Sequence, residues 1–158
     1  MNIFVLDYRI SLSAKYHCDK HVVKQILETC QLLCITMRVH NINYGYKVTH
    51  RNHPCRLWLD KSKENFNWLK KLGLELSKEY TYRYGKKHKT QSIIEGTYCP
   101  NQIPDKDLTD FAQAMPDQYK STDAVIAYRN YYRNEKQRIL IYTRREVPYW
   151  LTDIGRQK

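Results

Sequence analysis

The sequence lacks the apolar runs and cysteine patterns that mark membrane and secreted proteins. No stretch approaches the roughly 20 apolar residues of a transmembrane helix. The opening MNIFVLDYRISL has an acidic residue at Asp7 and no signal-peptide core. The five cysteines include no Cys-x-x-Cys pair, which argues against a disulfide framework and a zinc ribbon. We therefore expect a cytoplasmic protein with no membrane contact.

Signatures of the common enzyme classes are also missing. The sequence has no P-loop, no Gly-x-Ser-x-Gly, no His-Glu-x-x-His and no repeated acidic motif for a two-metal nuclease. His17 and His21 have the i,i+4 spacing of metal ligands, and Glu28, His50 or His53 are possible further ligands, but the zinc signature is incomplete. We expect no metal and no cofactor.

Positive charge and tyrosine are abundant. Lys plus Arg outnumber Asp plus Glu by 27 to 16, a net charge of +11, and 14 Tyr stand beside 3 Trp and 3 Phe. Such a surplus attracts polyanions, and aromatic faces beside basic side chains stack exposed bases. Nucleic acid, with DNA favoured, is the expected partner, and no obligate protein partner is implied. The alternative is a generically basic protein without a specific partner.

Hydrophobic periodicity predicts a mainly α-helical fold, with residues 1–158 as one compact domain and residues 2–7 as a short extended segment. One helix is expected from Ser11 or Ser13 to about His40, and a longer one from Pro54 to Tyr84, ended by Gly85.

A long ordered loop is expected to follow, interrupted by prolines and by one short helix around residues 108–115. Ser121, Thr122 and Asp123 are candidate caps for a last long helix through residue 140. The Pro-interrupted tail is too polar to extend that helix far.

A polar stripe follows the first predicted helix. Its members are spaced 4, 3, 4 and 3 residues apart and so share one face: His17, His21, Lys24, Glu28 and Gln31. Such a stripe suits the wall of a cleft. The alternative is a solvated face that carries an i,i+4 ion pair between Lys24 and Glu28.

Several basic and aromatic groups are candidates for binding nucleic acid. In the loop THRNHP, Arg51 precedes a helix N-terminus, which favours a phosphate; ordinary capping by Asn52 or His53 is the alternative. The last helix interleaves arginine with tyrosine, and two further basic clusters lie at 86–89 and 144–145. The predicted nucleic-acid-binding residues are Lys24, His50, Arg51, His53, Lys86, Lys87, Arg129, Tyr132, Arg133 and Arg144.

The pattern D-x-H-x6-E, formed by Asp19, His21 and Glu28, resembles the first long helix of the pyrimidine-dimer DNA glycosylases of the phage endonuclease V type. Further matches are scattered over about residues 1–85. They are the opening Met1, Ile3 and Phe4, then Lys20 eight residues before the Glu, and Asn52, His53 and Pro54 before the next helix.

The resemblance implies a compact helical DNA glycosylase with associated AP-lyase activity that nicks the strand. In that family the α-amino group of the first residue is the nucleophile and a Glu on the first helix assists. An α-amine, with an ordinary pKa of about 7.7–8.0, is more often neutral at pH 7 than a lysine at about 10.4. The resemblance therefore assigns the amine to Met1 and the carboxylate to Glu28, and we place His21 with them as catalytic.

Two other functions fit the same residues. One is a metal-independent nuclease or nucleotide-processing enzyme that uses His21, Glu28, His50 and His53 for acid–base chemistry and phosphate binding. The other is a non-catalytic basic protein that only binds nucleic acid. A covalent adduct with abasic DNA after borohydride reduction separates them, because only the glycosylase mechanism requires an amine nucleophile.

Overall fold

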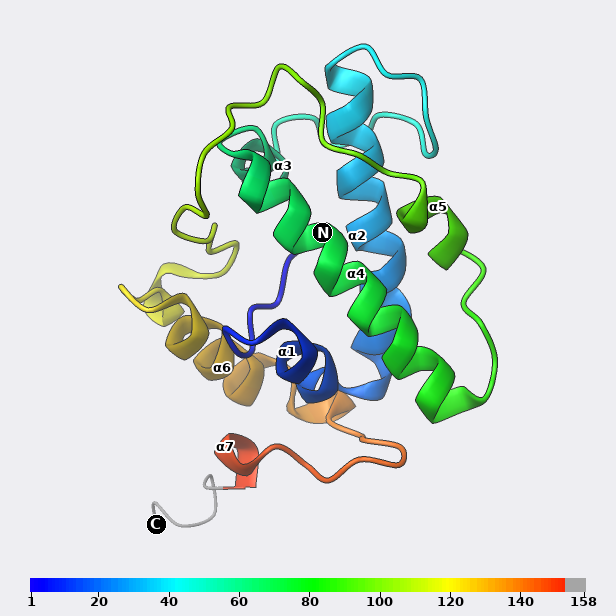
Figure 1. Cartoon of the computed structure of the whole chain (residues 1–158). Coiled ribbons are helices and arrows are strands. Elements are labelled where there is room, and N and C mark those ends of the chain that lie inside the picture. The colour runs from blue at the N-terminus through cyan, green and yellow to red at the C-terminus, as the bar shows by residue number, and fades with distance from the viewer. Residues whose placement is uncertain (153–158) are drawn as a thin grey trace.

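The chain folds almost entirely into helices, which confirms the predicted class. The structure, a computed structural model, describes residues 1–152. Over that range it has seven α-helices, two short 3-10 helices and no strand (Figure 1). The α-helices are α1 (Ile10–Tyr16), α2 (Asp19–Val39), α3 (Pro54–Leu59), α4 (Lys63–Tyr84), α5 (Gln91–Glu95), α6 (Ala124–Glu135) and α7 (Tyr149–Thr152), and the 3-10 helices are η1 (Asp117–Tyr119) and η2 (Gln137–Ile139).

The two longest helices form the centre of the fold. In Figure 1, α4 runs diagonally across α2, and α1 packs against α4. A Cβ atom added to Gly73 of α4 would lie 2.9 Å from Cγ2 of Thr29 on α2, so glycine permits this close approach. Both helices feed one buried apolar cluster that includes Val22, Ile26, Leu33, Phe66, Leu69 and Leu76.

The prediction of one unbroken helix from residue 11 or 13 to 40 is wrong. Helix α1 ends at Tyr16, and both His17 and Cys18 have extended backbone angles. Side chains from distant segments satisfy the backbone at this break: Tyr142 donates to the carbonyl of Tyr16 (2.8 Å), and the N–H of Cys18 donates to the Tyr132 hydroxyl (3.0 Å). Tertiary contacts thus replace the helical hydrogen bonds that the periodicity predicted.

Three other predicted helices also need correction. The last helix, expected through residue 140, ends at Glu135, and a separate 3-10 helix follows at Gln137–Ile139. The helix expected from Pro54 to Tyr84 is broken after Leu59, because the Ser62 hydroxyl accepts the N–H of Asn65 and starts α4 afresh. Residues 108–115 are not helical. In that segment Thr109 exchanges hydrogen bonds with the Asn65 side chain at 2.8 and 2.9 Å, which holds the backbone away from a helix.

Several helix ends lie where the sequence predicts them. Pro54 occupies the first turn of α3, and Gly85 ends α4 in the left-handed conformation, with φ +69°. Asp123 caps α6 by accepting the N–H groups of Val125 and Ile126. Residues 2–7 form no helix or strand, as expected, and residues 2–6 are buried.

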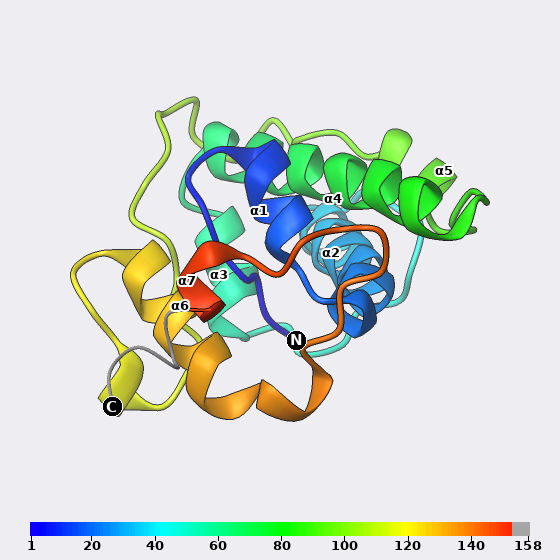
Figure 2. The same ribbon diagram turned by 90° about the horizontal axis from the view of Figure 1, so that it is seen from below.

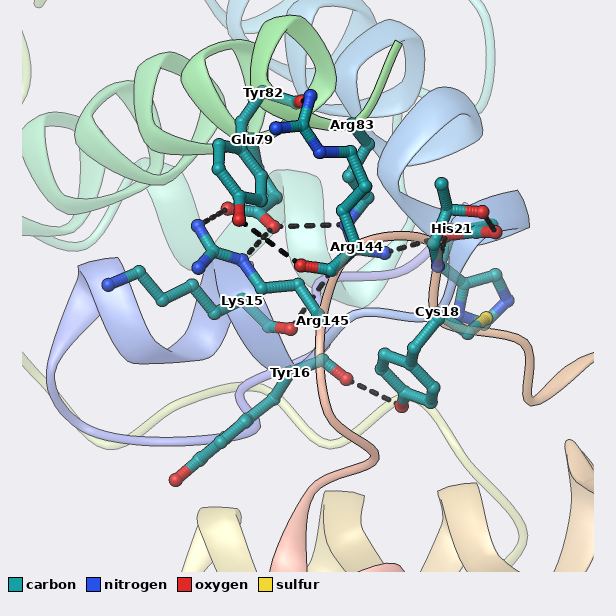
Figure 3. Close-up of polar contacts among 12 residues, drawn as sticks. Lys15, Tyr16, Cys18, His21, Glu79, Tyr82, Arg83, Arg144 and Arg145 are labelled. Atoms are coloured by element: carbon teal, nitrogen blue, oxygen red, sulfur yellow. Dashed lines mark hydrogen bonds and ion pairs between the residues drawn. The ribbon is translucent and has the colours of Figure 1, made fainter.

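A buried ionic network holds the end of α4 to the start of α2 and to the C-terminal segment (Figure 3). The fully buried Arg83 side chain donates to Glu79 Oε1 and to Asp19 Oδ1, both at 3.0 Å. Arg145 donates to both oxygens of Glu79, and Thr143 donates to both oxygens of Asp19. The network therefore fixes the first turn of α2, two residues before His21.

The paired guanidinium groups dominate the electrostatics of this network. Burial alone raises the pKa of Glu79, but hydrogen bonds from Arg145 and Arg83 outweigh it and bring the pKa below its ordinary value. Glu79 therefore stays ionised.

No helix within residues 1–152 is long and apolar enough to cross a membrane.

Candidate active site

A pocket of about 280 Å³ lies where the N-terminal segment meets α2 and α6. Figure 2 shows the N-terminus between α2 and the segment that follows α6. Four parts of the chain build the wall: the N-terminal segment, one face of α2, the residue before α3, and the region from residue 114 to 136. The lining residues are Met1, Asn2, Phe4, His21, Lys24, Gln25, Glu28, His53, Ala114, Tyr131 and Lys136.

Glu28 is the only acidic residue among those that line this pocket. Its Oε2 accepts the side-chain amide of Gln25 at 2.8 Å and the backbone N–H of Asn2 at 3.3 Å. Its Oε1 lies 3.6 Å from Nζ of Lys24, whose side chain is mostly exposed. With 9% of its surface exposed, the carboxylate is held at the pocket wall and remains accessible.

Asn2 anchors the start of the chain beside Glu28. Its side-chain amide donates to the carbonyl of Ala114 (2.8 Å), and its Oδ1 accepts the Tyr128 hydroxyl (2.9 Å). The α-amino nitrogen of Met1 is separated from the Asn2 amide nitrogen only by the Cα and the carbonyl carbon of Met1. The first amine of the chain and the Glu28 carboxylate therefore share one wall of the pocket.

His53 links the loop before α3 to the N-terminus. Its Nδ1 accepts the N–H of Cys55 at 3.1 Å and caps the helix, and the ring lines the pocket together with Met1. Burial lowers the pKa of His53, and the neighbouring N-terminal ammonium lowers it further. The imidazole thus meets Met1 mainly in its neutral form.

His21 is a neutral imidazole at the other end of the pocket. Its ring stacks on Phe4, with centroids 4.5 Å apart, and its Nδ1 lies 2.8 Å from the Tyr132 hydroxyl. Burial, followed by the nearby His17, Lys136 and Lys24, lowers the pKa of His21 to about 3.

Residues 1–92 match a family model described as pyrimidine dimer DNA glycosylase. The match covers more than half of the 158 residues. The chain belongs to this family. It matches no curated protein and no solved structure. The resemblance noted in the sequence is confirmed, and membership of a DNA glycosylase family makes DNA the substrate.

The part that matches the glycosylase family supplies most of the pocket. Met1, Asn2, Phe4, His53 and the four pocket residues of α2 lie within residues 1–92. Ala114, Tyr131 and Lys136 lie outside it. One wall of the pocket is thus built by a region that the family model does not describe.

The polar stripe predicted on the first helix is only partly present. His21, Lys24 and Glu28 lie on α2 and line the pocket. His17 belongs to the break after α1, where it is fully buried and its Nδ1 lies 2.6 Å from the carbonyl of Ser13. Within residues 1–152 no group of three or more His, Cys, Asp or Glu side chains could hold a metal ion.

Apart from His53, which is partly buried and lines the pocket, the predicted DNA-binding residues fall into two groups. The first group projects from loops or from α2 as exposed side chains: Lys24, His50, Arg51, Lys86, Lys87 and Arg144. Their contact with DNA stays a prediction. Lys87 also lies 3.9 Å from Glu95, and Arg144 donates to the carbonyl of Tyr82.

The second group, on α6, is engaged within the protein. Tyr132 is fully buried between Cys18 and His21, so its ring cannot stack on a base and that prediction is wrong. Arg129 donates to the carbonyl of Leu6 and to Asp7, and Arg133 donates to the carbonyl of Trp150. Both arginines hold α6 against other segments of the fold.

Six pocket residues were absent from the predicted site: Asn2, Phe4, Gln25, Ala114, Tyr131 and Lys136. Gln25 could have been found, because it stands three residues before Glu28 and therefore shares its helix face. Asn2, Tyr131 and Lys136 carry no such signal, because only the tertiary fold brings them to α2. Tyr131 was identified as part of an aromatic cluster without a defined contact.

Proposed function

We propose that the protein is a DNA glycosylase with associated AP-lyase activity, in which the α-amino group of Met1 is the nucleophile and Glu28 is the acid–base residue. The proposal requires a free amine at Met1. It goes beyond family membership, because it assigns the reaction mechanism to particular atoms of this chain.

The main support for the proposal is the hydrogen bond that the Asn2 N–H donates to Glu28 Oε2, at 3.3 Å. It sets the first residue of the chain beside the carboxylate that lines the pocket. Asn2, held by Ala114 and Tyr128, and His53, held by α3, position the amine in advance, which lowers the entropic cost of reaction.

The amine attacks C1′ of the target nucleotide, and the bond from C1′ to the base breaks with its electron pair leaving on the base, which takes up the proton that the amine loses. The C1′–O4′ bond then breaks with its electron pair leaving on O4′, which takes a proton from water, and the nitrogen lone pair forms the C1′=N bond of a protonated Schiff base between Met1 and C1′. Glu28 then removes a proton from C2′, the electrons form a C2′–C3′ double bond, and the 3′ phosphate leaves with the C3′–O pair. Water hydrolyses the Schiff base and frees the amine.

In the proposed reaction His21 shapes the pocket and transfers no proton. Since the pKa of about 3 leaves the imidazole neutral near pH 7, it does not supply a proton as a general acid. Its stacking on Phe4 shapes the pocket wall. A neutral His21 therefore does not fit the role of general acid that the alternative nuclease would give it.

A borohydride trap on duplex DNA with one abasic site tests the proposal. Incubation with the protein followed by reduction should give a covalent adduct, and mass spectrometry after trypsin should place the DNA on peptide 1–9. Acetylation of the Met1 amine should abolish both adduct and strand cleavage, because an amide nitrogen is not nucleophilic. Cleavage without any adduct would identify the nuclease instead.

Glu28→Gln separates the two steps. It keeps the size of the side chain and its helix propensity but removes the base. Strand cleavage at the abasic site should fall by about 100-fold or more, the usual contribution of a general base. The Schiff base should still form and be trapped. Full cleavage by this variant would contradict the role of Glu28.

A further inference from the structure

The pocket has two chemically different ends. Glu28 and His21 stand seven residues apart on α2, roughly 10 Å along the helix axis. Met1, Asn2 and Gln25 gather at the Glu28 end. The His21 end instead carries the rings of Phe4 and Tyr131 and the side chain of Lys136, the C-terminal cap of α6.

Three rings form the wall at the His21 end. Phe4 stacks on His21 on one side, and it is nearly parallel to Tyr131, with a centroid distance of 6.2 Å and an angle of 14°. Phe4 is almost fully buried, and the rings of Tyr128 and Tyr132 surround it. The wall is therefore preorganised, and the partly buried Tyr131 forms its accessible edge.

Lys136 lies over this wall without a salt-bridge partner. Its Nζ is 5.0 Å from the ring centroid of Tyr131 and 5.9 Å from that of Phe4. No acidic side chain within residues 1–152 pairs with it. In the same range the Tyr131 hydroxyl has no hydrogen-bond partner. Two hydrogen-bond donors are thus available above an aromatic surface.

A nucleobase satisfies this combination better than a phosphate does. The ring face stacks on a base, and the ammonium and phenol groups donate to carbonyl oxygens such as those on a pyrimidine edge. A phosphate would accept from the lysine but has no flat face to pack against the accessible edge of Tyr131. With C1′ of the nucleotide at Met1 and Glu28, its base would extend along α2 toward the rings.

We propose that Tyr131 and Lys136 are specificity-determining residues that bind the base of the target nucleotide at the His21 end of the pocket. This rests on the proposed function, because it uses Met1 and Glu28 to place the sugar. Both residues lie beyond residues 1–92, so base recognition belongs to the part of the chain outside the family match.

The test compares two duplexes that differ only in the presence of a base. One carries a single cyclobutane pyrimidine dimer and the other a single abasic site. Tyr131→Ala and Lys136→Ala should each lower kcat/KM on the dimer by about 10-fold, the range of one lost base-stacking contact. Incision and borohydride trapping at the abasic site should stay within about 3-fold of wild type, because no base is there to bind.

Two further variants complete the design. Tyr131→Phe keeps the ring and removes only the hydroxyl, so it should lie between wild type and Tyr131→Ala on the dimer. Tyr149→Ala removes an exposed tyrosine that stacks on Arg129 and is not among the residues lining this pocket, and it should leave both substrates unchanged. Retained activity on the abasic duplex also shows that a variant is folded.

Equal losses on both duplexes would overturn the proposal and assign Lys136 to a phosphate, or Tyr131 to general packing. Unchanged activity on the dimer would overturn it too, as would a wild-type protein that cleaves the abasic duplex but not the dimer. Absence of any adduct in the wild type would instead refute the amine mechanism, so the two proposals fail separately.

Discussion

Two histidines show how strongly burial controls single residues in this protein. His17 and His21 lie in the core around Phe4, and burial is the largest cause of the lowered pKa of each, to about 4 and about 3. Both imidazoles are neutral in the folded state at any pH above 5. In the unfolded chain they bind protons below about pH 6.5.

This difference predicts a loss of stability in mild acid. Below about pH 6.5 the unfolded chain binds protons that the folded protein excludes, so the free energy of unfolding falls as pH drops from 6.5 toward 4. From pH 7 to 4.5 each histidine should cost about 2–3 kcal/mol. Urea denaturation at both pH values measures the loss.

The matched variant is His17→Gln, which keeps a hydrogen-bond donor toward Ser13 but does not titrate. The drop in stability between pH 7 and 4.5 should shrink by roughly the share of one histidine, about 2–3 kcal/mol. An unchanged drop would mean that His17 is not the source of the acid sensitivity.

The sequence predicted the pocket residues that share one helix, but it did not predict those that reach the pocket only through the tertiary fold. His21, Lys24 and Glu28 were found from their spacing on α2, since i,i+3 and i,i+4 neighbours share a face. Lys136 could not be found, because it reaches the pocket through the packing of α6. Tyr132 was misjudged, since periodicity does not tell which tyrosine of a cluster is buried.

Among the elements, α2 depends most on contacts from elsewhere. Asp19, its first residue, binds Arg83 from α4 and Thr143 from the C-terminal segment. His21 follows two residues later, so the network in Figure 3 and the pocket meet at the first turn of α2. The position of α2 is thereby tied to α4 and to residues beyond the family match.

Removal of the central arginine should therefore destabilise the fold. Arg83→Met retains the length of the side chain but leaves Glu79 and Asp19 with fewer charged donors, and breaking a buried ion pair in this way costs about 3–5 kcal/mol. Lys78→Met, which removes an exposed lysine paired with Glu75, should cost less than about 1 kcal/mol. Urea unfolding at pH 7 compares the two. Similar losses would show that the buried network does not stabilise the protein.

The helix boundaries show the same limit of sequence reasoning. Local signals located three of them, because Pro54, Gly85 and Asp123 act through their own backbone or nearest neighbours. The break at His17 and Cys18 depends on partners more than 100 residues away, Tyr132 and Tyr142. The hydrophobic periodicity of the first 40 residues therefore could not predict where the helix breaks.

On the scale of the whole molecule, the sequence carries a net charge of +11, and the lining of the pocket holds one carboxylate, Glu28. Lys24 lies at that pocket, and Arg51 stands two residues from His53, which lines it. In the proposed mechanism the positive field attracts the phosphate backbone, and Glu28 then acts on one nucleotide. Binding and chemistry are thus assigned to different residues.

Because binding and chemistry are proposed for different residues, the affinity for DNA should depend on salt through the binding residues. Affinity for a duplex should fall linearly on a log–log plot against salt concentration, because each phosphate contact releases counterions with a slope of about 0.9 per contact. Lys24→Ala should lower the magnitude of that slope by about 1, whereas Lys78→Ala, which removes a lysine of α4 that does not line the pocket, should leave it unchanged. Fluorescence anisotropy of a labelled duplex with an abasic-site analogue, from about 50 to 200 mM KCl, measures the slope. An affinity that does not change with salt would contradict the prediction that phosphate contacts drive DNA binding. It would not bear on the amine mechanism, which the borohydride trap tests separately.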